Sequence, residues 1–132
     1  MIEGLRRVLE PDARIAYALL FGSGARGTLR PWSDVDVALG LGAGVRLSAL
    51  DLGDLASRLE APAGRRVDLV LLDEAPPGLA YRIFRDGQVI LARDRRAMSE
   101  RKARAILEYL DFRPVEEACA RGVLAAATAR GR

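Results

Sequence analysis

Three aspartates interrupt short apolar segments, where an isolated carboxylate is costly to bury. Asp34 and Asp36 lie in the segment DVDVAL at residues 34–39, and Asp68 lies in RVDLVLL at residues 66–72. Because side chains alternate along a strand, we expect Asp34 and Asp36 on one face and their apolar neighbours on the other. Carboxylates on a shared face can hold a divalent cation that also binds phosphate oxygens. The pattern predicts magnesium-dependent chemistry at a phosphate.

A glycine-rich turn, Gly22-Ser23, precedes Asp34 by ten intervening residues. Glycine lets the backbone approach a triphosphate closely, the N–H groups at a helix start favour an anion, and the serine adds a hydroxyl donor. Together with the carboxylates, this turn predicts nucleotidyl transfer from a nucleoside triphosphate. Two magnesium ions roughly 4 Å apart would suit such a site. Without metal the carboxylates repel one another, and their pKa values are expected to rise.

Composition excludes several other chemistries. The chain has no histidine, which removes Ser-His-Asp triads, Cys-His pairs and zinc sites with imidazole ligands. Its single cysteine, Cys119, lies in an alanine-rich segment and is interpreted as a small buried residue. The net charge is +3, and the basic residues at 93–104 are interrupted by acidic ones, so we expect a solvated helix face and no direct nucleic-acid binding.

The elements that must position these residues alternate between helices and strands. Helices are expected at 2–12, 25–29, 47–61 and 77–84, and strands at 15–21, 34–39, 66–72 and 88–91, with glycines 40, 42 and 44 forming a flexible link. The region from 97 is expected to be helical, with a break at 111–114 and a second helix to about 127. These elements predict an α+β fold, in which a small mixed β-sheet of about four strands is flanked by helices and followed by a C-terminal helical tail.

The segment GSGARGTLRPWSDVDVAL resembles the signature of the minimal nucleotidyltransferases, a branch of the DNA polymerase β-like superfamily. The segment RRVDLVLLDEAPPGLAYRIFRDGQVIL looks like the family's third-carboxylate strand, the following helix and the closing strand. The resemblance covers about residues 1–92 and implies a nucleotidyltransferase core there, with 93–132 as an extension that joins the same domain or contacts a partner. By this resemblance the nucleotide-binding residues are Gly22, Ser23 and Arg26, and the catalytic and metal-binding residues are Asp34, Asp36 and Asp68.

The resemblance also suggests an acceptor, because such proteins are commonly antitoxins paired with a helical HEPN ribonuclease. It implies that this chain is a protein adenylyltransferase that uses ATP and Mg2+ to adenylylate a tyrosine of a HEPN-type toxin. Two other hypotheses stay open. The chain could be a binding module that silences its partner by occlusion, or it could modify a small hydroxylated molecule such as an aminoglycoside.

Other features of the sequence leave alternatives open. Asp68 could instead pair with Arg65 or Arg66, and for Arg82 and Arg85 a solvated helix face is favoured over nucleotide binding. No apolar run approaches the roughly 20 residues of a membrane helix, so we expect a cytoplasmic protein without membrane contact. The nucleotide base, the number of nucleotides added and a homo-oligomeric state are not determined by the sequence.

Overall fold

The computed structural model describes residues 1–27, 30 and 33–130, without the side chains of residues 24, 26, 115, 116 and 123–130. The strands are β1 (Ile15–Phe21), β2 (Val35–Leu41), β3 (Val67–Leu71) and β4 (Gln88–Ala92). The helices are α1 (Ile2–Leu9), α2 (Ser23–Arg26), α3 (Ala49–Ala63), α4 (Pro77–Asp86) and α5 (Arg95–Arg130), with a 3-10 turn η1 (Leu72–Glu74). The expected α+β fold with a small mixed sheet is confirmed.

Within the described residues the sheet has four strands in the order β3-β2-β1-β4. β1 pairs antiparallel with both β2 and β4, whereas β2 and β3 are parallel and are joined by the α3 crossover. In the parallel pair Asp36 lies opposite Asp68. The sheet therefore brings together two carboxylates that are separated by thirty-one residues in the sequence.

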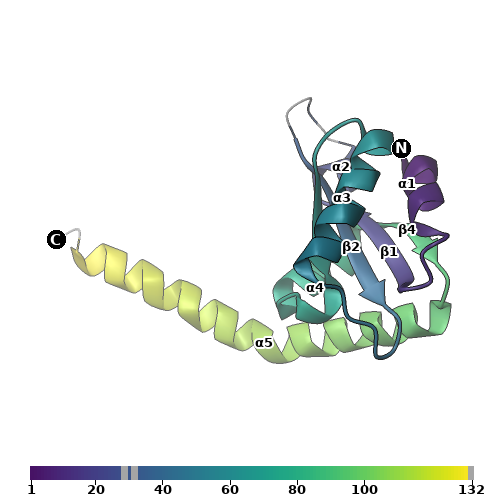
Figure 1. Ribbon diagram of the computed structural model, residues 1–132. Coiled ribbons are helices and arrows are strands. Elements are labelled where there is room, and N and C mark those ends of the chain that lie inside the picture. Colours follow the sequence, from purple (N-terminus) through teal and green to yellow (C-terminus); the bar gives the residue numbers. More distant parts are fainter. Residues whose placement is uncertain (28–29, 31–32, 131–132) are drawn as a thin grey trace.

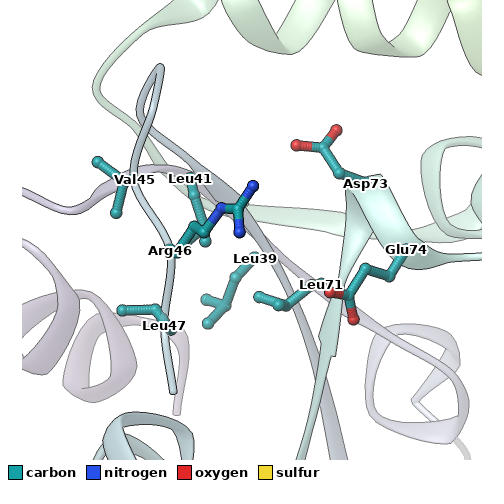
Figure 2. A pocket seen from close by; sticks show the side chains of 8 residues that line it. All are labelled: Leu39, Leu41, Val45, Arg46, Leu47, Leu71, Asp73 and Glu74. Atoms are coloured by element: carbon teal, nitrogen blue, oxygen red, sulfur yellow. The ribbon is translucent and has the colours of Figure 1, made fainter.

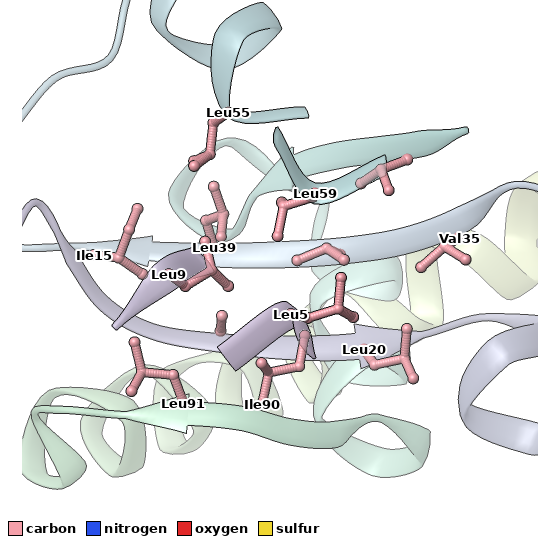
Figure 3. Close-up of a cluster of buried hydrophobic side chains, with 13 residues drawn as sticks. Leu5, Leu9, Ile15, Leu20, Val35, Leu39, Leu55, Leu59, Ile90 and Leu91 are labelled. Carbon is pink, nitrogen blue, oxygen red and sulfur yellow. The ribbon is translucent and has the colours of Figure 1, made fainter. Parts of the chain in front are cut away.

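Helices cover both faces of the sheet, so the fold has three layers (Figure 1). On one face, Leu5 and Leu9 of α1 and Leu55 and Leu59 of α3 pack over strand residues such as Leu39, and all five are fully buried (Figure 3). On the other face, α4 and the start of α5 cover a second cluster. This cluster contains Ala16, Tyr17, Leu19, Ala38, Leu72, Ala80, Ile83, Phe84 and Ala105.

Gly40 belongs to β2, and the prediction that it forms part of a flexible link is wrong. It pairs with Tyr17 of β1, and a Cβ atom on Gly40 would lie only 2.1 Å from the Tyr17 ring. Burial raises the pKa of the Tyr17 hydroxyl to about 12. A glycine is required here because the tyrosine ring occupies the space that any side chain would need.

α5 is one helix of 36 residues, so the predicted break at 111–114 is wrong. Pro114 lies inside this helix, where a proline removes one backbone hydrogen bond and bends the axis without having to end the helix. The first half of α5 lies along the domain, and the axis then changes direction and the second half extends away (Figure 1). Arg101 fixes the first half, since its side chain is buried and Nη2 donates to the Leu72 carbonyl at 2.9 Å.

Cys119 lies on the extending half of α5 and is exposed, so the prediction of a buried cysteine is wrong. An alanine-rich sequence indicated packing, but in this chain the helix has left the body of the domain at that point (Figure 1). In the described part of the chain, no helix is long and apolar enough to cross a membrane.

Candidate active site

Asp36 and Asp68 point to the same face of the sheet from adjacent strands. Val35, Val37 and Leu39 of β2 are buried on the α1 and α3 side, which places Asp36 on the side of α4 and α5. Asp36 is half-buried and Asp68 is exposed. The face predicted for Asp36 is therefore correct. In β3 the same alternation, with Val67, Leu69 and Leu71 packed in the first cluster, places Asp68 on that face.

Asp34 lies just before β2, which begins at Val35, and its side chain is exposed. The predicted strand therefore starts one residue too early, and strand alternation alone does not orient Asp34. Its backbone is held on one side by the Val35 N–H, which donates to the Arg66 carbonyl at 2.8 Å. On the other side the Ser33 N–H donates to the Arg30 carbonyl at 3.0 Å.

Arg65 binds the backbone of Arg30 and Ser33 and does not pair with Asp68 in the described part of the chain. Its Nη1 donates to the carbonyl oxygen of Arg30 and, at 3.4 Å, to that of Ser33. Among the described residues Asp68 pairs with neither Arg65 nor Arg66, so the alternative interpretation of Asp68 as an ion-pair partner is wrong. Arg65 instead fixes the backbone that carries Asp34. The sequence contains no local signal for this role, because Arg65 lies 32 positions after Ser33.

The three aspartates interact electrostatically. The pKa of Asp36 is raised above its ordinary value, first by burial and then by the negative charges of Asp68 and Asp34. Each of these causes disfavours the ionised form of Asp36. The site is thus short of positive charge, and a bound cation would relieve the repulsion.

The Gly22-Ser23 turn lies directly against Asp36. Gly22 has φ of 71° and ψ of −147°, and a Cβ atom there would lie 2.5 Å from Asp36 Oδ2. Only a glycine lets the backbone pass so close to the carboxylate. Ser23 begins the short helix α2, and Gln88 of β4 holds that helix by donating from Nε2 to the Ala25 carbonyl at 2.9 Å.

Arg26 ends α2, and its side chain lies outside the part of the chain that the structure describes. The expectation that it supports the phosphate loop stays a prediction. Gln88, by contrast, supports the loop and was not predicted, since its position next to α2 follows only from the pairing of β4 with β1.

The donor chemistry of the site suits magnesium. Among the described residues, no group of three acidic or cysteine side chains closes around a point that could hold a metal ion. Magnesium seldom needs such a cage, because it usually binds one or two carboxylates and completes its coordination with water and substrate phosphate oxygens. Asp36 and Asp68, paired beside a backbone turn that can approach phosphate, match that requirement.

Two hollows differ in how they relate to these residues. One of about 230 Å³ opens beside the turn and is lined by Phe21, Gly22, Leu79, Arg82, Ile83, Arg85 and Asp86. A second of about 330 Å³ lies at the opposite end of β2 and β3, where Leu39 and Leu71 form its floor and Arg46, Asp73 and Glu74 its rim (Figure 2). Only the first adjoins the predicted site.

Comparison with known proteins places these features in a family. The family model described as Polymerase beta, Nucleotidyltransferase matches residues 3–96. No curated protein sequence matches the chain. A protein described as a candidate minimal nucleotidyltransferase is 32% identical, with a TM-score of 0.53, and the match covers 64% of this chain and 86% of that chain.

Two further solved structures resemble the whole domain. A chain from the crystal structure of a toxin–antitoxin with AMP-PNP has a TM-score of 0.79 and 22% identity, covering 93% of this chain and 98% of that chain. A chain from the complex of a tri-AMPylated Shewanella oneidensis HEPN toxin with an MNT antitoxin has a TM-score of 0.72 and 19% identity, covering 94% and 99%. At these identities the likeness is one of fold.

Proposed function

Because this chain belongs to the polymerase beta nucleotidyltransferase family, we propose that it is an antitoxin that transfers AMP from ATP to a tyrosine of a HEPN-type toxin. The observation that carries the chemistry is the pairing of Asp36 with Asp68 beside the Gly22 turn. The toxin–antitoxin complexes among the similar structures, one with AMP-PNP and one with a tri-AMPylated HEPN toxin, support the choice of nucleotide and acceptor.

In this proposal the two sides of the site have different tasks. The backbone at Gly22 and Ser23 binds the triphosphate, and Arg26 supports that loop. Asp34, Asp36 and Asp68 would hold Mg2+, which supplies charge neutralisation at the phosphates when it is bound.

The reaction is a displacement at the α-phosphorus. The tyrosine oxygen forms a bond to this phosphorus, the bond to the bridging oxygen of the β-phosphate breaks, and pyrophosphate leaves with the bonding electrons. The tyrosine proton must leave as the oxygen attacks, and Asp68 is exposed on the open side of the pair, where its carboxylate can accept it. Asp36 is half-buried and lies directly against the Gly22 backbone, which would bind the triphosphate.

We further propose that residues 1–92 form the catalytic core, on which the first half of α5 packs, and that the exposed part of residues 93–132 provides the surface for the toxin. Three large apolar side chains on α5, Leu107, Leu110 and Phe112, have relative exposures of 63%, 54% and 38%. Exposed apolar side chains grouped on one element favour contact with another protein. The reaction would take place in the cytoplasm, where ATP and an intracellular ribonuclease are both present.

The test is transfer of label from [α-32P]ATP to a co-purified HEPN partner in the presence of Mg2+. We expect the partner to be labelled by the wild-type chain and not by Asp36→Asn or Asp68→Asn. Asp54→Asn is the matched control, because it also removes one carboxylate but lies on α3, paired with Arg58 at 3.1 Å.

Labelling by both site variants at the wild-type rate would show that the residue assignment is wrong. If the Asp36→Asn chain instead inhibits the toxin fully without nucleotide, occlusion is the mechanism and transfer is not. If the label appears on an aminoglycoside and never on the protein partner, the acceptor is a small molecule and not the toxin.

A further inference from the structure

The hollow beside the Gly22 turn contains two arginines in different electrostatic states. Arg82 and Arg85 lie one turn apart on α4, and both line the hollow together with Gly22 and Phe21. Phe21 packs against the buried cluster on the α4 and α5 face, which is the face to which Asp36 points. The two arginines are therefore on the same side of the sheet as the candidate active site.

Arg85 is neutralised within its own helix. Its Nε and Nη2 donate to the two carboxylate oxygens of Asp86 at 3.0 and 2.8 Å, and its guanidinium lies 5.6 Å from the centre of the Tyr81 ring. Both interactions hold the charge close to α4. Arg85 thus adds little positive potential to the hollow.

Arg82 is exposed and makes no hydrogen bond or ion pair with any described residue. Several exposed arginines on other helices pair with a carboxylate four residues away, as Arg58 does with Asp54 and Arg96 with Glu100, although Arg7 on α1 has no such pair among the described residues. The carboxylate four residues beyond Arg82 is Asp86, and both of its oxygens bind Arg85. The arrangement leaves the Arg82 guanidinium unneutralised next to the turn.

An anionic substrate needs such a group here. Asp34, Asp36 and Asp68 place three negative charges beside the turn, and a nucleoside triphosphate brings several more. A guanidinium matches phosphate because its planar N–H groups bind two oxygens at once and keep their charge at every physiological pH.

We propose that Arg82 binds the β- or γ-phosphate of the incoming nucleotide and neutralises the pyrophosphate as it leaves. The inference rests on the proposed function only in taking a nucleoside triphosphate as the substrate, and it does not depend on the acceptor. It assigns to Arg82 a contact with substrate, where the sequence favoured a solvated helix face.

The test is calorimetric titration of the chain with an α,β-methylene ATP analogue, with Mg2+ present throughout. Arg82→Ala is expected to weaken binding about tenfold, which corresponds to about 1.4 kcal/mol for loss of one charge-assisted contact. Binding of AMP, which lacks the β- and γ-phosphates, is expected to change less than twofold. Arg82→Lys should keep part of the affinity, since it retains the charge without the planar geometry.

Arg58→Ala is the control, because it removes an exposed arginine from α3 without touching the hollow. Equal losses for AMP and for the triphosphate analogue, or no loss for either, would overturn the proposal. An equal loss in Arg85→Ala would also overturn it, by showing a general effect of charge. Arg82→Gln repeats the measurement if the alanine variant melts at a lower temperature than the wild type.

Failure of this proposal and failure of the proposed function are separable. Loss of triphosphate affinity in Arg82→Ala with no labelling of any HEPN partner would leave the Arg82 contact standing and remove the acceptor. If Arg82→Ala labels the partner normally and binds the triphosphate analogue as tightly as the wild type, the Arg82 contact is ruled out and the proposed acceptor stands.

Discussion

Asp36→Asn is expected to make the metal-free protein more stable while removing its activity. In the folded state Asp36 is half-buried and lies opposite Asp68 on the neighbouring strand, with Asp34 close enough to raise its pKa further. The ionised carboxylate therefore opposes folding. An asparagine of nearly the same volume removes the charge and keeps a polar group at the mouth of the site.

The magnitude follows from the geometry of the paired strands. Adjacent strands lie about 5 Å apart, and two unit charges at that distance repel by roughly 1–3 kcal/mol for an effective dielectric constant between 80 and 20. Because the site is open to water on the Asp68 side, the lower end applies. About 1 kcal/mol corresponds to a rise in melting temperature of roughly 2–5 °C for a domain of this size.

The pH dependence has a defined sign. A carboxyl whose folded-state pKa is raised destabilises the fold at pH values above that pKa, and this destabilisation is relieved as the pH falls through it. The advantage of Asp36→Asn should therefore be full at pH 7, shrink as the pH falls, and vanish below the ordinary value of 3.8.

The assay is thermal unfolding of both proteins with EDTA and with millimolar Mg2+, followed by circular dichroism, together with the transfer reaction. Mg2+ with ATP should raise the melting temperature of the wild type and should have a much smaller effect on Asp36→Asn. A metal-free Asp36→Asn protein that melts below the wild type would refute the electrostatic reasoning. An equal response to Mg2+ in both proteins would refute the placement of the metal.

Three other substitutions test the supports of the site. Gly22→Ala should reduce transfer at least tenfold and destabilise the fold by about 1–2 kcal/mol in urea titrations. The alanine would be strained at a positive φ, and its Cβ atom would lie against Asp36. Unchanged activity would contradict the close approach of Gly22 to Asp36. Gly40→Ala should lower the free energy of unfolding by about 2–3 kcal/mol without a specific effect on nucleotide binding, since the new Cβ atom would clash with the Tyr17 ring. A melting temperature equal to that of the wild type would contradict this packing. Arg65→Ala should raise the Mg2+ concentration for half-maximal transfer severalfold, because the Arg30 and Ser33 carbonyls lose their hydrogen bonds to the guanidinium. Arg65→Lys should show a smaller rise. If Arg65→Ala lowers only the melting temperature, the role of Arg65 is limited to folding.

The fold was largely predictable because its strands are short apolar runs with clear boundaries. β1 was expected at 15–21 and is found there, and α4 and β4 begin at the expected residues, 77 and 88. The errors fall where tertiary packing overrides a local signal. Gly40 was interpreted as part of a linker, because no residue near it in the sequence shows that the Tyr17 ring packs against it. Pro114 was interpreted as part of a helix break, because proline disrupts helices and the sequence does not show that α5 continues through this residue.

The sequence by itself was enough to predict the chemistry, because residue types carry it: carboxylates for a cation, a glycine-serine turn for phosphate and no histidine for other mechanisms. Strand alternation was enough to predict the face of Asp36, whereas Asp34 lies just before the strand. Only the tertiary structure decided that Asp36 lies opposite Asp68 and that Arg65 binds the Ser33 carbonyl just before Asp34. It also decided that Arg85 is paired with Asp86, while Arg82 lines the same hollow without an ion pair to any described residue. Each of these facts depends on strand pairing or on competition for one carboxylate, and such relations arise only after distant segments have packed together.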